Sequence, residues 1–138
     1  MDHRIIDLHV HSTESDGTFT PKDLVAEAKK AGLAAFALTD HDTCQGVGKA
    51  MPCAASAGIE LIPGIELSTD YHGKEVHIVG LYIDIENEQL LKKTAEYRKC
   101  RSERNALMVE ALQKEGLSIT MEELVAENPD CVITRANI

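Results

Sequence analysis

At 138 residues, the chain is long enough for one domain with a buried core, but it is short for a complete large barrel. Its 23 acidic residues against 14 basic ones give a net charge of −9, which disfavours a role in coating nucleic acid because phosphate backbones need a positive surface. An acidic protein can still act on phosphates where metal ions supply the missing positive charge.

The sequence also lacks the features of membrane and secreted proteins. No apolar run approaches the roughly 18 residues that span a bilayer, and the N-terminal MDHRIIDLHV lacks the basic-then-apolar order of a signal peptide. The four cysteines are widely spaced and form no CxxC motif, which favours reduced thiols. We therefore expect a cytoplasmic protein with no membrane contact.

The first expected element is a strand over residues 5–10, in which polar and apolar residues alternate. The alternation places Asp7, His9 and His11 on one face. The two imidazoles then point the same way and can reach one ion.

Two helices and a buried strand follow. Thr20 is a good N-cap for a helix that ends at Gly32, and residues 34–39 form the strand. A second helix covers about residues 43–57 and is closed by Gly58. The first two strands, joined by a helix, predict a βαβ unit.

Residues 59–69 and 75–83 predict a β-hairpin, with its turn at His72-Gly73. If the turn is centred there, Ser68 faces His77. Glu66 then lies diagonally from His77 on the same face, roughly 7 Å away at the backbone.

From residue 87 the chain becomes helical. Residues 87–114 predict a long helix with a polar middle that projects from the core, and Thr120 with Glu123 predicts a capping box for a short helix. The final residues 133–138 resemble the opening of a further helix that is cut off, which predicts an incomplete chain.

The histidines and carboxylates recur at the ends of the predicted strands or in the loop just after them, the edge at which parallel α/β proteins assemble their sites. Imidazoles with carboxylates and no thiolate suit Zn, Mn or Fe. Clustered divalent ions lower the pKa of a shared water, so that hydroxide exists near neutral pH, and they clamp phosphoryl oxygens. The expected metal and catalytic residues are His9, His11, Asp16, His41, Glu66 and His77.

Other polar residues have simpler interpretations. We assign no role to His3, in the N-terminal tail, or to His72, in a turn. Asp7, Asp40 and Asp42 fit helix capping or the orientation of imidazoles better than direct ligation.

Arg98, Arg101 and Arg104 spread over about a third of the circumference of the predicted long helix. They could bind a substrate phosphate, because a guanidinium pairs with phosphate through two hydrogen bonds. Such a series more often forms a solvated face, here balanced by Glu96 and Glu103.

Four stretches, DLHVHSTESDGTFTP, ALTDHDT, PGIELST and EVHIVGLYID, resemble in this order the N-terminal motifs of the PHP family, the polymerase and histidinol phosphatase metallo-phosphoesterases. The resemblance covers about residues 5–85 and continues more loosely into the helical segment. It implies an α/β fold, the N-terminal part of a distorted (β/α)₇ barrel, with a helical insertion after the fourth strand.

The resemblance also implies up to three divalent ions. By position in the motifs, the first ion is held by His9, His11 and Glu66, the second by Glu66 and His77, and the third by Asp16 and His41. Family members carry further ligands beyond the fourth strand, and Asn137 stands where a histidine is common. We therefore expect residues 1–85 to be half of a metal-binding barrel and 86–138 to be an insertion segment, with weak metal binding and little or no turnover for this chain alone.

The resemblance implies a hydrolase that releases phosphate from a nucleotide or trims a short oligonucleotide. A histidinol phosphatase and a non-catalytic metal-binding module are the alternatives. Half a barrel also leaves a sheet edge and an apolar face uncovered, which predicts a homodimer or strand exchange between copies.

Overall fold

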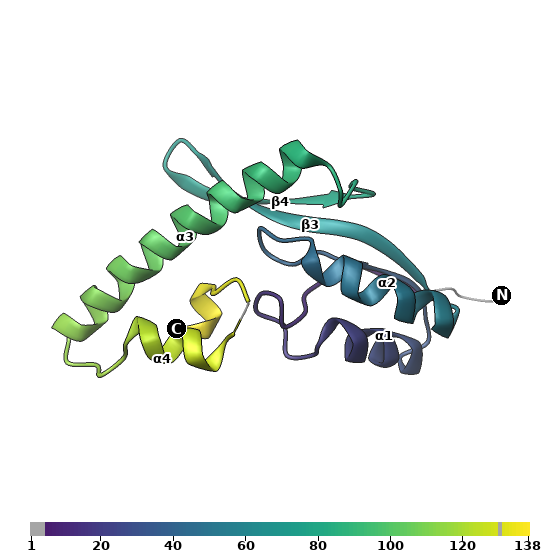
Figure 1. Ribbon diagram of the computed structural model, residues 1–138, viewed down its shortest axis with the longest axis horizontal. Coiled ribbons are helices and arrows are strands. Elements are labelled where there is room, and N and C mark those ends of the chain that lie inside the picture. The colour runs from purple at the N-terminus through teal and green to yellow at the C-terminus, as the bar shows by residue number, and fades with distance from the viewer. Residues whose placement is uncertain (1–4, 130) are drawn as a thin grey trace.

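The computed structural model describes residues 5–129 and 131–138, and it has the expected α/β architecture (Figure 1). His3, to which no role was assigned, lies outside these residues. In chain order the elements are β1 (Ile5–Val10), α1 (Pro21–Lys30), β2 (Leu33–Leu38), α2 (Gln45–Ala57), β3 (Glu60–Tyr71), β4 (Lys74–Leu81), α3 (Glu88–Lys114), α4 (Met121–Glu127) and the 3₁₀ helix η1 (Arg135–Asn137).

The four strands form one curled sheet in the order β1-β2-β3-β4. The β1/β2 and β2/β3 pairs are parallel and the β3/β4 pair is antiparallel, so the predicted βαβ unit and hairpin are both confirmed. The hairpin turn lies at His72-Gly73, where both residues have positive φ. Ser68 pairs with His77, as the position of the turn predicts. The sheet is half of a barrel wall.

Helices α1 and α2 lie side by side against one face of the sheet (Figure 1). Thr20 caps α1 by accepting a hydrogen bond from the Asp23 amide, and Gly58 ends α2 with φ of 65°. Between the helices and the sheet is the main core, where each large side chain contributes about 1.5–3 kcal/mol by leaving water. Its largest fully buried members are Phe36, Leu38 and Val47.

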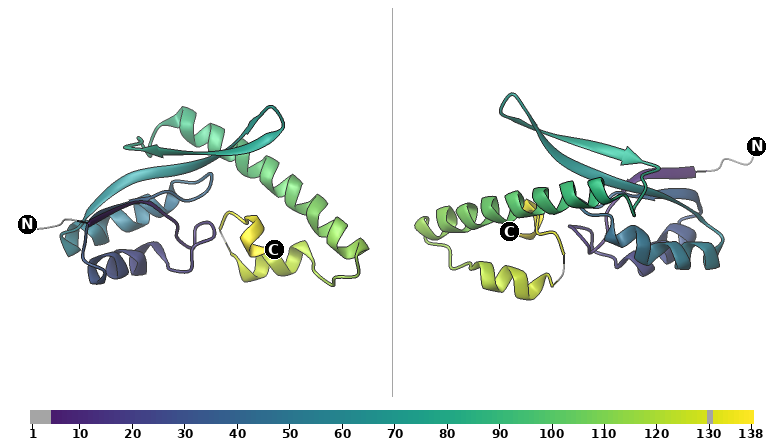
Figure 2. Two further views of the ribbon diagram at one scale, coloured as in Figure 1. Left: turned by 180° about the vertical axis from the view of Figure 1, so that it is seen from behind. Right: turned by 45° about the horizontal axis from the view of Figure 1, so that its top comes forward.

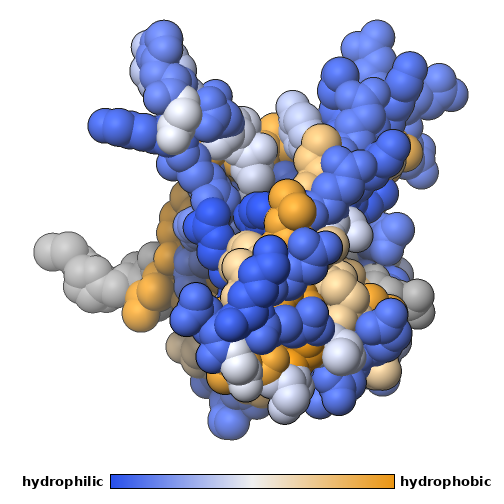
Figure 3. Space-filling model, turned by 90° about the vertical axis from the view of Figure 1, so that its left-hand side faces the viewer, coloured by the Kyte–Doolittle hydropathy of each residue, from blue (hydrophilic) through white to orange (hydrophobic). Residues whose placement is uncertain are grey.

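The opposite face of the sheet is thinly covered. Its buried cluster consists of Ala35, Ala37 and Ile62, with Leu81 packed against it. The edge strands β1 and β4 expose large apolar residues, including Ile6 at 53% and Ile78 at 52%. Hydrophobic side chains also reach the surface between hydrophilic projections in the space-filling view (Figure 3). Exposed apolar residues are therefore present on both edge strands, while dimerisation stays a prediction.

Helix α3 begins beside the sheet and extends beyond it, and α4 then turns back beneath α3 (Figure 2). Thr120 and Glu123 form the predicted capping box of α4. The expected helix opening near the end is the short η1, capped by Thr134. The division into 1–85 and 86–138 stays a prediction. In the described part of the chain, no helix has the length and apolar character needed to cross a membrane.

Candidate metal centre

The six predicted site residues lie in the strands or in the segments just after them, and they meet at one end of the sheet. His9 lies in β1, Glu66 in β3 and His77 in β4. The residues that follow β1 and β2 supply His11, Asp16 and His41, and His41 forms an isolated bridge to Glu66. The period of two in β1 and the hairpin register place these side chains on the same side, as the sequence predicts.

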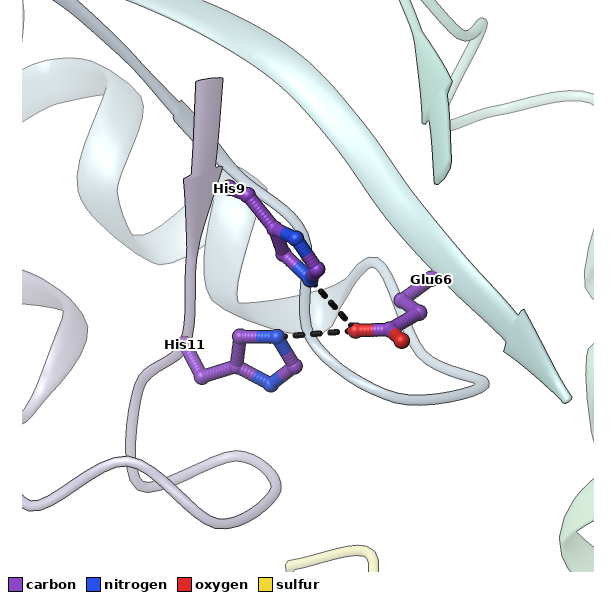
Figure 4. Close-up of side chains that lie close together, drawn as sticks. All are labelled: His9, His11 and Glu66. Carbon is purple, nitrogen blue, oxygen red and sulfur yellow. Dashed lines mark hydrogen bonds and ion pairs between the residues drawn. The ribbon is translucent and has the colours of Figure 1, made fainter. Parts of the chain in front are cut away.

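Glu66 is the central acceptor of the cluster, and its side chain is only 6% exposed. Its Oε2 lies 2.6 Å from Nε2 of His9 and 2.9 Å from Nε2 of His11 (Figure 4). Its Oε1 lies 2.7 Å from Nδ1 of His77. One carboxylate therefore joins β1, β3 and β4.

Asp16 is a second carboxylate shared by two histidines. Its Oδ1 lies 2.9 Å from Nδ1 of His11, and its Oδ2 lies 3.4 Å from Nε2 of His41. His11 thus has a carboxylate at each ring nitrogen. The imidazoles of His9, His11, His41 and His77 form a continuous row with centroid spacings of 5.1, 4.7 and 5.0 Å.

The donor atoms fall into three overlapping groups, each within 4.8 Å: His9, His11 and Glu66; His11, Asp16 and His41; and His41, Glu66 and His77. This grouping fits divalent ions, because four imidazoles face only two carboxylates and cations can take the place of the protons between them. Nδ1 of His41 is buried and has no hydrogen-bond partner among the described residues. A cluster of four imidazoles, one of them with a buried unpaired nitrogen among the described residues, fits a metal-binding site better than a packed structural core.

The cluster shifts the protonation of its own members. Burial lowers the pKa of His11, but the hydrogen bond and charge of Asp16 outweigh burial and raise it. For His77 the hydrogen bond to Glu75 is the main cause of a raised pKa. Burial favours the neutral forms of Asp16 and Glu66, yet their histidine partners hold both pKa values below the ordinary range.

Asp40 fixes the loop that carries Asp16. Its carboxylate accepts hydrogen bonds at 2.7 Å from the Ser12 amide, the Ser12 hydroxyl and the Ser15 hydroxyl. Burial raises the pKa of Asp40. The carboxylate is fully used inside the protein, which agrees with an orienting role in preference to ligation.

Asp42 has φ of 52° and turns its carboxylate away from the imidazoles. Its Oδ1 accepts from the Ser68 amide at 2.9 Å, and its Oδ2 accepts from two nitrogens of Arg101 at 3.1 and 2.7 Å. Arg98 donates to the Asp42 carbonyl at 3.0 Å. Asp7, by contrast, is exposed and accepts only from the His9 amide among the described residues.

Three residues at the edge of the site were not anticipated from the sequence. Thr134 donates its hydroxyl to Oδ2 of Asp16 at 3.1 Å. Glu75 lies 3.1 Å from Nε2 of His77 and 2.6 Å from Arg135. No local pattern marks Thr134 or Arg135, because they reach the site only when α4 turns back. Glu75 could have been found, since it is two residues from His77 on the same face of β4.

Comparison with known proteins relates this geometry to a family. The 5′-3′ exoribonuclease Rnm of Escherichia coli (strain K12) is 38% identical over 120 residues, which are 86% of this chain and 41% of that protein. The 3′,5′-nucleoside bisphosphate phosphatase of Chromobacterium violaceum is 36% identical over 129 residues, 92% of this chain and 45% of that protein. This chain therefore spans less than half the length of these curated relatives.

A solved structure gives the same relationship. A Bifidobacterium adolescentis protein assigned as a metal-dependent phosphoesterase superposes with a TM-score of 0.89 at 33% identity, over 98% of this chain and 48% of that one. The sequence profile of the PHP domain matches residues 7–126. With the half-barrel and the row of imidazoles at its rim, these matches show that the chain belongs to the PHP domain family.

Proposed function

We propose that this chain supplies the metal-binding half of a phosphoesterase that hydrolyses nucleotides or short oligonucleotides. The observation that carries the proposal is the position of Glu66, whose two oxygens face different imidazoles at 2.6 and 2.7 Å. A carboxylate shared in this way can bridge two ions, which is the arrangement used for phosphoryl transfer. The names of the exoribonuclease and bisphosphate phosphatase relatives support the substrate class.

The residues of the site have different proposed roles, according to where they lie. His9, His11, Asp16, His41, Glu66 and His77 would hold the ions, as the three donor groups suggest. Bound Mn, Zn or Fe would supply a nucleophile by lowering the pKa of water and would neutralise charge on the phosphoryl oxygens. Asp40 would hold the Asp16 loop in place through Ser12 and Ser15. The net charge of −9 makes this supply of positive charge necessary for a dianionic substrate.

Metal binding and phosphate release by the His9→Ala/His11→Ala double variant test the proposal. We expect the chain to bind Mn²⁺ and the double variant to lose most of that affinity, together with any phosphate release from a panel of nucleotides. His72→Asn is the matched control, because His72 lies in the exposed turn with φ of 53°, a conformation that asparagine tolerates. Equal Mn²⁺ binding by all three proteins would overturn the proposal.

The same measurements separate the alternatives. Mn²⁺ binding that raises the melting temperature, without phosphate release by any form, would indicate a non-catalytic metal-binding module. Release from histidinol phosphate in preference to nucleotides would indicate a histidinol phosphatase.

A further inference from the structure

The hydroxyl of Thr134 reaches a predicted metal ligand from a distant part of the sequence. It lies 3.1 Å from Oδ2 of Asp16, and the residue that carries it is only 4% exposed. The two oxygens of Asp16 also face two imidazoles, with Oδ1 2.9 Å from His11 and Oδ2 3.4 Å from His41. Thr134 therefore contacts the carboxylate on which one of the three donor groups is centred.

The backbone around Thr134 is fixed from two sides. Val132 donates its amide to the Glu14 carbonyl at 2.8 Å, which ties the C-terminal segment to the loop after β1, beside which it lies (Figure 2). Asn105 of α3, 1% exposed, donates its side-chain amide to the Ile133 carbonyl at 2.9 Å. The hydroxyl consequently approaches the carboxylate from a defined direction.

A cation in this donor group would leave the Asp16 carboxylate with fewer hydrogen bonds. An ion replaces the protons between imidazole and carboxylate, so the contacts with the two imidazoles no longer orient the carboxylate. Ser15 cannot take over that role, because its single hydroxyl hydrogen is directed to Asp40 at 2.7 Å and its contact with Asp16 is 3.4 Å long. The Thr134 hydroxyl can stay in place, since it carries no charge and does not occupy the ring nitrogens.

We propose that Thr134 is a positioning residue, which orients the Asp16 carboxylate for metal binding. This inference rests on the proposed function, because it takes Asp16 to be a metal ligand. The hydroxyl occupies one lone pair of Oδ2 and leaves the other available to an ion beside His41. Outer hydrogen-bond partners of metal ligands typically contribute about 10–100-fold to metal affinity. The segment that returns through α4 thereby helps to build a site whose ligands all come from the N-terminal part of the chain.

Calorimetric Mn²⁺ titration of Thr134→Val tests the proposal, because valine keeps the shape of the buried side chain and lacks the hydroxyl. We expect the affinity for at least one Mn²⁺ ion to fall by about 10–100-fold, and Thr134→Ser to restore it to within about threefold. Thr134→Ala should lose the same affinity, which provides a second test if the valine is not accommodated.

Asn137→Ala is the matched control. The Asn137 side chain accepts a hydrogen bond from the Thr134 amide at 2.7 Å, so it belongs to the same cap of η1, but the described residues show no hydrogen bond between it and Asp16. The control should bind Mn²⁺ as the native chain does. Equal losses of Mn²⁺ affinity in Asn137→Ala and Thr134→Val would indicate a purely structural role and overturn the inference.

A double-mutant cycle shows whether Thr134 acts through Asp16. Asp16→Asn alone should weaken Mn²⁺ binding, and adding Thr134→Val should then change the affinity by less than about twofold, because the carboxylate that the hydroxyl orients is already gone. Native affinity in either single variant, or losses that multiply in the double variant, would overturn the inference.

Failure of the proposed function gives a different result. Mn²⁺ affinity that depends on Thr134, in a protein without Mn²⁺-dependent phosphate release, would retain the inference and reject the enzyme. Mn²⁺-dependent release that is lost in His9→Ala/His11→Ala, with native Mn²⁺ affinity in Thr134→Val, would do the reverse.

Discussion

Glu66 and His77 lie diagonally across the β3–β4 hairpin, with Nδ1 of the histidine 2.7 Å from Oε1 of the glutamate. The residue directly opposite His77 is Ser68, so the contact depends on the hairpin register and on two long side chains. The other oxygen of Glu66 faces β1. A single side chain therefore connects the antiparallel edge of the sheet with its parallel part.

Glu66→Gln should weaken Mn²⁺ binding by about 100-fold or more, because loss of an outer hydrogen-bond partner alone typically costs 10–100-fold. Glutamine keeps the size of the side chain but cannot carry the negative charge between two imidazole groups. Isothermal titration calorimetry measures the change. Glu60→Gln, at an exposed position of the same strand, is the control and should bind as the native chain does. An unchanged Mn²⁺ affinity in Glu66→Gln would contradict the role of the Glu66 carboxylate as a metal ligand.

The metal-free chain should lose stability as the pH rises above about 6.5. His11 and His77 have raised pKa values, so their contribution is complete below the ordinary value of 6.5 and is lost as the pH passes the raised values. Asp16 and Glu66 have lowered pKa values, so their contribution is present above the ordinary values of 3.8 and 4.5 and is lost in more acidic solution. These four groups therefore stabilise the metal-free fold most between about pH 4.5 and 6.5.

Bound metal should oppose this loss of stability at higher pH, because ions compete with protons for the same histidine nitrogens. Melting curves in chelator should shift to lower temperature from about pH 6.5 to 8.5, while the added stabilisation by Mn²⁺ should grow. A metal-free melting temperature that rises across this interval would contradict the assigned directions.

Gly46→Ala should destabilise the fold by about 1–3 kcal/mol. A Cβ at this position would lie 2.6 Å from Oδ2 of Asp40 and 3.1 Å from Cδ2 of Leu38. Asp40 cannot move aside because Ser12 and Ser15 hold it. Urea unfolding measures the effect.

Gly48→Ala is the matched control in the same helix, where the nearest atom to an added Cβ is 3.9 Å away. It should stabilise the fold by about 0.5–1 kcal/mol through helix propensity. If both alanines had the same effect, the close packing at Gly46 would be of no consequence.

Arg101→Met should destabilise the fold by about 3–5 kcal/mol, since it leaves the buried carboxylate of Asp42 without its cation. The two side chains are 6% and 1% exposed. Lys93→Met breaks the exposed pair with Glu96 and should leave the unfolding midpoint in urea unchanged. A small loss of stability in Arg101→Met would argue against the structural role and would favour the binding of substrate phosphate, which the position of Arg101 in the sequence also allows.

The chain should self-associate through its exposed edge strands, as measured by light scattering after size exclusion. Ile6 and Ile78 are about half exposed on the two edge strands, and Ile6→Lys/Ile78→Lys should shift the population to monomer. Leu107→Lys is the control, because Leu107 is 67% exposed on α3, away from the sheet edges. A native chain that is monomeric at all concentrations would contradict the prediction.

Sequence periodicity was sufficient for the parts of the fold and site that depend on local geometry. Alternation in β1 aligned His9 with His11, and the turn at His72-Gly73 fixed the register that brings His77 to Glu66. Helix caps such as Thr20 depend on neighbouring residues alone, so they too were predictable.

Contacts made by distant segments were not predictable in this way. The arginines of α3 looked equivalent in the sequence, but Arg101 is buried in a pair with Asp42 whereas Arg104 is partly exposed and lies 3.7 Å from Glu75. That difference is set by the direction in which α3 crosses the sheet. Thr134 likewise depends on the return of the chain through α4, which no single-sequence pattern encodes.

The hydrogen bond from Thr134 to Asp16 joins residues 118 positions apart. Closing a loop of that length is entropically costly, and it can occur only after α3 and α4 have taken their places. The Asp16 loop is already held by Asp40 through Ser12 and Ser15, so the Thr134 hydroxyl adds its hydrogen bond to a corner formed by the N-terminal segment. Formation of that hydrogen bond would consequently report the arrival of the C-terminal segment, later than formation of the hairpin that brings Glu66 and His77 together.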